Sequence, residues 1–264
     1  MAHGEDTIWQ AIRHEAEADA RQEPVLASFL YNTILNHETL ERALSYHLAN
    51  KLANANLQPI SLMELFLTAF DGDAEIGKAM RADLRAVRER DPACRGYSMP
   101  LLYFKGFQAL ESYRMAHWLW QRDRVPLAYM LQSRISEVFA VDIHPAARFG
   151  RGIMLDHATG IVVGETAVVG NNVSFLHSVT LGGTGKATGD RHPKIGNGVL
   201  LGVGSKLLGN IKIGDGAKIG ANSVVLDDVP PHTTAVGVPA IVVGRTETAQ
   251  PALSMDHRID TTHA

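Results

Sequence analysis

The sequence predicts an α+β protein in which an all-helical N-terminal domain is followed by a β-solenoid. Residues 5–140 contain few Gly and many Ala, Leu, Glu and Arg, and their apolar positions recur at spacings of three and four, as on amphipathic helices. From about residue 141, Gly becomes frequent and apolar residues recur at every sixth position. A helix repeats about every 3.6 residues and a strand about every 2, so a sustained period of six indicates short strands that turn a corner in each repeat.

The change of composition divides the chain into three parts. We expect a helical domain over 1–140, a solenoid over 141–246 and a polar, flexible tail over 247–264. With 264 residues, of which 45% are hydrophobic, the chain is long enough to bury a sizeable core.

Seven helices are expected in the N-terminal domain, at 6–21, 24–34, 38–54, 61–70, 73–90, 100–122 and 125–140. Ser61 and Glu64 match a capping box, which predicts a helix start at Ser61. Another helix is expected to end at Asp91, because Pro92 excludes the residue before it from helical geometry. Asp91 therefore occupies an exposed corner.

Two apolar series describe the solenoid. One series has a residue at every sixth position: Phe149, Leu155, Ile161, Ala167, Val173 and Val179. Its companion consists of Val163, Val169, Phe175 and Leu181. The interval from Leu181 to Ile195 is fourteen residues, two more than two repeats, so the chain must leave the coil and return. We therefore predict an extruded loop within 185–194.

Composition also limits the partners. The net charge is only −3 and no segment gathers Lys and Arg, which disfavours nucleic acid and anionic membranes and favours small molecules. The N-terminus lacks a signal-peptide pattern and no run of 18 apolar residues occurs, so we expect a cytoplasmic protein without a membrane span. Cys94 is the only cysteine, which excludes an internal disulfide, and we expect it to be inert.

Eight polar residues interrupt the apolar ladder: Asp142, His144, Asp156, His157, His177, Asp190, Arg191 and His192. Asp142 precedes His157 by fifteen residues, slightly less than one coil of three repeats, so stacking would bring the two close. A carboxylate that accepts a hydrogen bond from one imidazole nitrogen raises the basicity of the other. The pair predicts a general base able to deprotonate an alcohol, and Arg191 in the extruded loop suits a bidentate grip on a carboxylate.

Other interpretations of these residues remain. The glycine-rich run at 182–186 resembles a phosphate loop, but Ala187 stands where Ser or Thr is required. Four histidines, at 144, 157, 177 and 192, could hold zinc between subunits, yet neither HxH nor CxxC spacing occurs, so no metal is expected. In the absence of a site, Asp142 would be a turn aspartate, and Arg191 and His192 would be solvated surface. We expect His177 to be a core or interface residue.

The same residues carry a resemblance to the bacterial serine O-acetyltransferases of cysteine biosynthesis, which are hexapeptide-repeat acyltransferases. The resembling segments are DPACRGYSMPLLYFKGFQALESYRMAHWLW, VDIHPAARFGRGIMLDHATGIVVGETAVVG, SVTLGGTGKATGDRHPKIG and GAKIGANSVVLDDVPPHTTAVGVPA. The resemblance implies that the solenoid is a left-handed parallel β-helix. It also implies trimers formed through the β-helix, hexamers formed through the helical domains, and acetyl-CoA bound between adjacent β-helices.

The resemblance further implies the reaction. His157 is expected to take the proton from the hydroxyl of L-serine, and Asp142 to orient the imidazole. The hydroxyl then attacks the thioester of acetyl-CoA directly, giving O-acetyl-L-serine and CoA without an acyl-enzyme, so Cys94 is not required. Acetyl-CoA is a co-substrate, and no tightly bound cofactor is expected.

Binding residues follow from the same resemblance. Asp91 and Asp156 are expected to hold the ammonium group of serine, and Arg191 and His192 its carboxylate. Close contacts to the CoA arm are expected at Gly183, Val203 and Ala221. L-cysteine, similar to serine in size and charge, is expected to act as a feedback inhibitor at the serine site.

Two expectations stay open. An acetyltransferase of the same fold that acts on another hydroxyl or amine, such as homoserine, a sugar or a drug, is the alternative function. Many family members end in an isoleucine that binds O-acetylserine sulfhydrylase, whereas this sequence ends in Ala264. The resemblance therefore does not carry that partner over to this chain.

Overall fold

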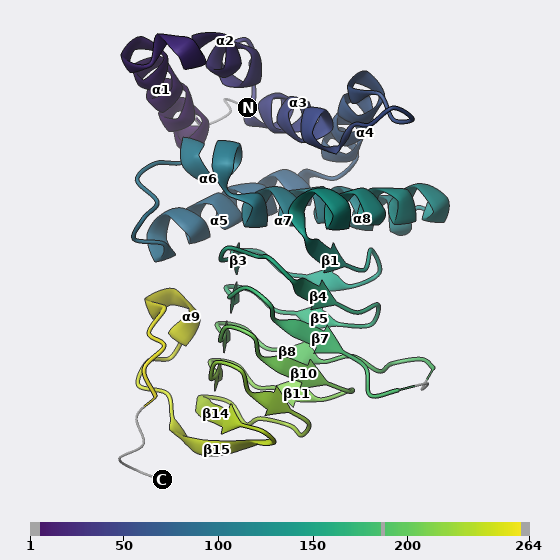
Figure 1. The fold of residues 1–264 in the computed structure, drawn as a ribbon, viewed down its shortest axis with the longest axis vertical. Helices are drawn as coiled ribbons and strands as arrows, with labels where there is room; N and C mark the ends of the chain where they lie inside the picture. Colours follow the sequence, from purple (N-terminus) through teal and green to yellow (C-terminus); the bar gives the residue numbers. More distant parts are fainter. Residues whose placement is uncertain (1–5, 186–187, 260–264) are drawn as a thin grey trace. The chain divides into compact units, whose positions relative to one another are not determined.

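The computed structural model describes residues 6–185 and 188–259 and consists of two compact units that divide between Phe104 and Lys105. Helices make up the first unit, and a stack of short strands makes up most of the second (Figure 1). The change from helices to strands occurs at Val141, as the composition indicates. Two helices before Val141 nevertheless belong to the second unit, because they pack on its first coil.

The first unit contains these helical elements: α1 (Thr7–Gln22), η1 (Pro24–Leu26), α2 (Ala27–Leu30), η2 (Tyr31–Leu35), α3 (Leu40–Leu52), α4 (Pro59–Gly72), α5 (Ala74–Arg90) and α6 (Ser98–Tyr103). The predicted start of α4 at Ser61 is wrong, because Pro59 supplies the fixed φ that suits a first helical turn. The single helix expected over 100–122 is two helices, separated by the extended backbone of Phe104. The segment expected as one helix over 24–34 changes from 3-10 through α to π geometry.

A buried histidine makes the first unit sensitive to acid. His47 on α3 is 5% exposed, and burial, aided by the charge of Lys51, lowers its pKa to about 4. The unfolded chain, with a histidine pKa of about 6.5, therefore takes up this proton first. The stabilisation is complete above pH about 6.5 and is lost as the pH falls toward 4, by up to about 3 kcal/mol.

Replacing His47 with Gln is therefore expected to flatten the decline of the unfolding temperature between pH 6.5 and 4. The measurement is thermal unfolding across that range, with His14→Gln, at an exposed position of α1, as the control. An unchanged pH dependence in His47→Gln would exclude His47 as its source.

The second unit is a parallel β-helix with helices at both ends of its chain. It begins with α7 (Lys105–Trp120) and α8 (Val125–Phe139) and ends with α9 (Pro251–Ser254). Its strands are β1 (Val141–Ile143), β2 (Arg148–Phe149), β3 (Met154–Leu155), β4 (Ile161–Val163), β5 (Val168–Val169), β6 (Ser174–Phe175), β7 (Thr180–Gly182), β8 (Lys194–Ile195), β9 (Leu200–Leu201), β10 (Lys206–Leu208), β11 (Lys212–Ile213), β12 (Lys218–Ile219), β13 (Val224–Val225), β14 (Thr233–Gly237) and β15 (Ala240–Arg245).

The strands form three sheets, one for each side of the coil. The sheet orders are β1-β4-β7-β10-β13, β2-β5-β8-β11 and β3-β6-β9-β12-β14-β15, and all pairs are parallel except β14 with β15. Inward residues such as Val141, Ile161, Val179 and Phe175 are fully buried and form the core. Helix α7 packs on the first coil, where Tyr113 donates to the carbonyl of Ala147 and its ring lies 5.0 Å from that of Phe149.

The coils differ in length, and the first is longer than the repeat predicts. Val162 pairs with Thr180, eighteen residues on, which is the length of three repeats. Asp142, however, pairs with Val162, and Met154 pairs with Ser174, both twenty residues on. The two additional residues must therefore lie between β3 and β4, in the corner Asp156–Gly160.

This insertion corrects the predicted series. Phe149 stacks on Val169 and Leu155 on Phe175, so both belong to the companion column, whereas Ile161 stacks on Val141. The apparent series changes column at the insertion. Both columns are apolar. After the two inserted residues, the residue that falls six positions on still belongs to an apolar column, so the insertion cannot be seen in the sequence.

The extruded loop lies where it was expected, but its length was misjudged. Thr180 pairs with Lys206, 26 residues on, which is eight more than a regular coil of eighteen. The interval of fourteen residues from Leu181 to Ile195 is therefore one repeat of six plus a loop insertion of eight, rather than two repeats plus two. The loop connects β7 to β8. Residues 186 and 187, within the glycine-rich run and its Ala187, lie outside the described residues.

The C-terminal segment expected to be flexible contains a packed helix in its described part. Pro251 and Ala252 of α9 are buried, the Ser174 hydroxyl donates to the carbonyl of Ala252 at 2.9 Å, and the Ala252 N–H donates to Gly198 at 3.2 Å. Two small apolar residues therefore anchor the segment to the sheet that contains β6. Residues 260–264, which carry the expectation about the sulfhydrylase partner, lie outside the described part of the chain.

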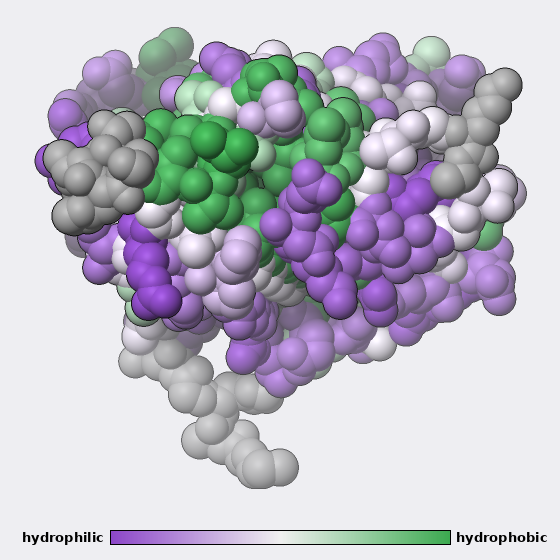
Figure 2. Space-filling model, turned by 90° about the horizontal axis from the view of Figure 1, so that it is seen from below, coloured by the Kyte–Doolittle hydropathy of each residue, from purple (hydrophilic) through white to green (hydrophobic). Residues whose placement is uncertain are grey.

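Apolar side chains gather on one face of the molecule (Figure 2). Among the exposed large apolar residues, four come from the last coil and the β14–β15 hairpin: Leu226, Val238, Ile241 and Val242. Within residues 6–185 and 188–259, no helix has the length and apolar character needed to cross a membrane.

Candidate functional site

The predicted site residues of the second unit fall mainly on two edges of the solenoid. We call the edge between the β3 and β1 sheets the base edge; its corners are 156–160, 176–179, 202–205 and 220–223. We call the edge between the β1 and β2 sheets the loop edge; its corners include 144–147, 164–167 and the loop 183–193.

Within one chain, these edges separate the predicted residues. The base edge contains Asp156, His157, Val203 and Ala221, and the loop edge contains Gly183, Arg191 and His192. Asp142 lies on β1, in the sheet between the two edges. Asp91 belongs to the first unit, where its carboxylate accepts from the Ala93 N–H at 2.8 Å beyond the end of α5.

The inserted corner presents His157 to solvent. His157 and Ala158 both have left-handed backbone conformations, with φ of 53° and 60°, and the His157 side chain is 76% exposed. Such conformations cost non-glycine residues about 1–2 kcal/mol each, so the surrounding structure must hold them. Asp156 Oδ2 lies 3.8 Å from His157 Nε2.

His177 lies beside His157. It follows twenty residues later, which is the length of the first coil with its two-residue insertion. The two rings meet edge to face, with centroids 5.9 Å apart and planes at 69°. The Nδ1 atom of His177 is buried and has no hydrogen-bond partner among the described residues. Because an unpaired buried N–H is less tolerable than an unpaired acceptor, the proton belongs on Nε2. The residue expected in a core or interface thus offers a donor at the base edge.

Asp142 lies next to the inserted corner without being bonded to His157. The Ala140 carbonyl, two residues before Asp142, accepts from the Gly160 N–H at 2.8 Å. Asp142 Oδ1 accepts from Gln132 Nε2 at 2.7 Å, and the described residues of one chain contain no hydrogen bond from His157 to Asp142. Gln132 fixes the carboxylate and leaves Oδ2 as an acceptor.

On the loop edge, two residues that follow β4, Glu165 and Thr166, hold Arg191 and His192. Arg191 Nη2 lies 2.7 Å from Glu165 Oε2, and this bond lowers the pKa of Glu165. The Thr166 hydroxyl accepts from the backbone N–H groups of Arg191 at 3.0 Å and His192 at 3.1 Å. Sequence reasoning missed Glu165 and Thr166, because an acid and a hydroxyl are ordinary residues at turns.

His192 is held as a neutral donor. The Thr166 N–H donates to His192 Nδ1 at 3.2 Å, so the proton lies on Nε2, and burial together with the charge of Arg191 lowers the pKa of this histidine. A Cβ added to Gly164 would lie 2.0 Å from His192 Nε2, so only glycine leaves room for the ring. The loop therefore returns to the coil with a cation and an N–H donor side by side.

The four histidines considered as zinc ligands do not form a metal-binding cluster within the described residues. His144 packs edge to face against Trp120 and Tyr129, with centroids 5.2 and 5.6 Å away, and its Nδ1 accepts from the Ala146 N–H at 3.0 Å. Within the described ranges, no three His, Cys, Asp or Glu residues gather in a way that would hold a metal ion. His144 is thus a packed residue of the loop edge.

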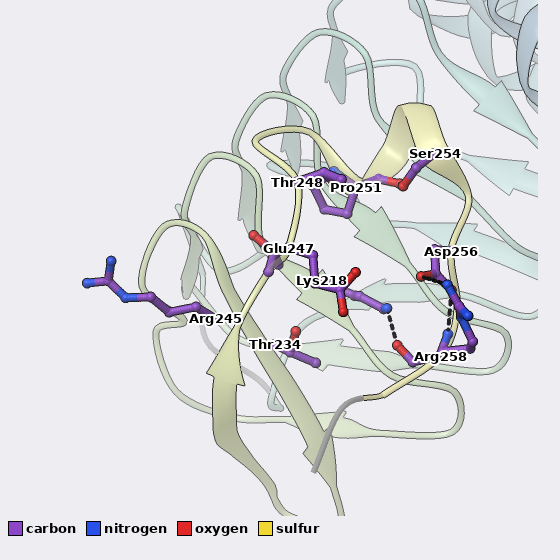
Figure 3. A pocket seen from close by; sticks show the side chains of 10 residues that line it. Lys218, Thr234, Arg245, Glu247, Thr248, Pro251, Ser254, Asp256 and Arg258 are labelled. Atoms are coloured by element: carbon purple, nitrogen blue, oxygen red, sulfur yellow. Dashed lines mark hydrogen bonds and ion pairs between the residues drawn. The ribbon is translucent and has the colours of Figure 1, made fainter. Parts of the chain in front are cut away.

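Val203 and Ala221 lie on successive coils of the base edge below His177, and a Cβ on Gly202 would lie 2.8 Å from the Ala221 nitrogen. This is a close approach between successive coils, and the same approach occurs at Gly150 and Gly170. A separate cavity of about 40 Å³ lies under the C-terminal segment, where Lys218 Nζ donates to the carbonyl of Arg258 and Arg258 pairs with Asp256 at 3.0 Å (Figure 3). That cavity has room for a water molecule and not for a nucleotide.

Known proteins resemble the chain over nearly its whole length. A family described as "Serine acetyltransferase, N-terminal" matches residues 8–112, and one described as "Bacterial transferase hexapeptide (six repeats)" matches residues 192–227. The serine acetyltransferase of Salmonella typhimurium is 57% identical over 258 residues, which cover 98% of this chain and 94% of that protein.

Two solved structures show the same fold with ligands. Soybean serine acetyltransferase complexed with serine is 62% identical, with a TM-score of 0.90 and coverage of 92% of this chain and 100% of that one. Serine acetyltransferase from Brucella abortus strain S19 in complex with coenzyme A is 52% identical, with a TM-score of 0.90 and coverage of 92% and 97%. These matches confirm the predicted order of a helical region followed by a parallel β-solenoid.

Proposed function

Because the chain belongs to the serine acetyltransferase family, we propose that it acetylates the hydroxyl of L-serine from acetyl-CoA with His157 as the general base. The products are O-acetyl-L-serine and CoA, and the reaction opens cysteine biosynthesis. The observation that carries the role of His157 is the inserted corner, which presents an exposed imidazole 3.8 Å from the Asp156 carboxylate and beside the His177 ring.

In the proposed mechanism, His157 accepts the proton of the serine hydroxyl while the oxygen attacks the thioester carbon. The tetrahedral intermediate collapses, the carbon–sulfur bond breaks, and the imidazolium returns its proton to the leaving thiolate. Asp142 orients the imidazole through Oδ2 once the substrates are bound. An Nε2–H on His177 is suited to stabilise the oxyanion, since it faces the same edge as the base.

Serine recognition is proposed to use charges of both signs. Asp156 and Asp91 would neutralise the ammonium, and Arg191 and His192 would bind the carboxylate through the guanidinium and an Nε2–H. Such pairing distinguishes an amino acid from a neutral alcohol, because each buried charge left without its partner costs binding energy. L-cysteine carries the same two charges and would occupy the same groups as an inhibitor.

We propose that two chains complete each site. His157 and Arg191 lie on different edges of one solenoid, with the β1 sheet between them, so one chain does not bring the base to the carboxylate-binding pair. In a cyclic trimer the base edge of one chain meets the loop edge of the next. The groove between them would hold acetyl-CoA along Val203 and Ala221, opposite Gly183.

The exposed apolar residues on the last hairpin are consistent with self-association of the chain. The helical domains would join two trimers into a hexamer.

The test of the function is release of CoA thiol in the presence of acetyl-CoA and a panel of acceptors. We expect release to require L-serine and to be slow with homoserine, sugars and amines. Faster release with one of those acceptors would support the alternative acetyltransferase, and thiol release independent of any acceptor would contradict both.

A further inference from the structure

The corner that contains His157 is the most strained of the base edge. The next two corners each contain one residue of positive φ, Ser178 at 62° and Gly204 at 70°. The inserted corner contains three, because Gly160 at 76° follows His157 and Ala158. Two of these three are not glycine, so contacts from outside the corner must determine its conformation.

The first turn of α7 supplies such contacts. Gly106 lies directly against the last residue of β3, since a Cβ on Gly106 would be 2.0 Å from the carbonyl oxygen of Leu155. That carbonyl belongs to the residue before Asp156. On the other side of His157, Lys105 Nζ donates to the hydroxyl of Thr159. Two consecutive residues of α7 thus hold both ends of the segment that presents the base.

Apart from the His157–His177 ring contact and a hydrogen bond of 3.4 Å from the Ser178 hydroxyl to the Thr159 carbonyl, the corner is bonded to the neighbouring coils mainly through its backbone. The Asp156 N–H donates to Phe175 at 2.8 Å, the Ser178 N–H donates to Thr159 at 2.8 Å, and Gly160 donates to Ala140 at 2.8 Å. These bonds continue the ladder of the coils before and after the insertion. From α7, Gly106 contacts the chain before His157 and Lys105 contacts the chain after it.

We propose that Lys105 and Gly106 are positioning residues, which set the place of the His157 imidazole by fixing the chain on both sides of it. This proposal rests on the proposed role of His157 as base. It predicts that changes on α7 affect the chemical step while leaving CoA binding intact, because the residues proposed to contact CoA lie on later coils.

Gly106→Ala is expected to push the Leu155 backbone away and to lower kcat by roughly tenfold to a hundredfold, the loss that a misplacement of about 1 Å brings. Lys105→Met keeps the length of the side chain but cannot donate, and should lower kcat by a smaller factor, whereas Lys105→Arg should restore it. The KM for acetyl-CoA should remain unchanged in all three variants. Controls are Gly244→Ala, where a Cβ meets nothing within 4 Å, and Lys78→Met on the exposed face of α5.

A double-mutant cycle separates positioning from general damage. If the Lys105–Thr159 bond is what matters, Lys105→Met, Thr159→Val and their combination should all lower kcat by the same factor, and Thr159→Ser should be active. The proposal would be overturned if the double variant lost kcat by the product of the two single losses. It would also be overturned if Lys105→Met and Thr159→Val both kept wild-type kcat, even if Gly106→Ala fails to fold. Wild-type activity in His157→Asn would instead overturn the role of the base itself.

Discussion

Replacing His157 with Asn or Ala is expected to lower kcat by roughly 10²- to 10⁴-fold, the contribution of a general base. Asn is the better replacement, since it tolerates the left-handed backbone at this position, with φ of 53°, and keeps the corner folded. The KM for acetyl-CoA should stay the same, because the imidazole acts on the serine hydroxyl. The measurement is steady-state thiol release with both substrates varied.

The matched control for His157 is His14→Ala, which removes an exposed imidazole from α1. A second check is the pH dependence of kcat/KM in the wild type, which a single general base makes rise with pH through one ionisation. If His157→Asn retained more than about a tenth of wild-type kcat, general base catalysis by this residue would be excluded.

Arg191→Ala is expected to raise the KM for serine by roughly tenfold to a hundredfold, the value of a hydrogen bond to a charged group. The KM for acetyl-CoA should change little. Arg191→Lys should restore only part of the affinity, because an ammonium lacks the forked donors that match a carboxylate and Glu165.

Lys212→Ala serves as the control, since it removes a cation from the exposed face of β11. Serine affinity should be unchanged in that variant. Equal increases in the two KM values of Arg191→Ala would indicate a general disturbance of the loop and would contradict a specific contact with the serine carboxylate.

The architecture could be predicted from the sequence because a period of six fits neither helix nor ordinary strand. The local irregularities could not. The insertion between β3 and β4 is concealed because Phe149, Leu155 and Ile161 stay six apart while changing column. The start of α4 was misplaced because two N-terminal signals, Pro59 and Ser61, lie close together, and the geometry favours the proline.

Only those residues of the candidate site that break the apolar repeat beside another polar residue could be predicted from the sequence. His157 could be found because a histidine beside an aspartate interrupts an apolar ladder, which calls for a chemical explanation. His177 interrupts the same ladder but lacks a neighbouring carboxylate, so only the twenty-residue coil reveals that it faces His157. The roles of Glu165, Thr166 and Gly164 depend on a loop that returns 26 residues later, and no local pattern encodes that meeting.

The most direct test of a site shared by two edges is to co-express His157→Asn and Arg191→Ala chains and to measure the thiol release of the mixed oligomers. Each variant alone should be nearly inactive at low serine. Random mixing should restore about a quarter of the wild-type sites, since one interface in four then combines an intact base edge with an intact loop edge. Mixed oligomers that remain as inactive as the two parents would contradict the account and assign the whole site to one chain.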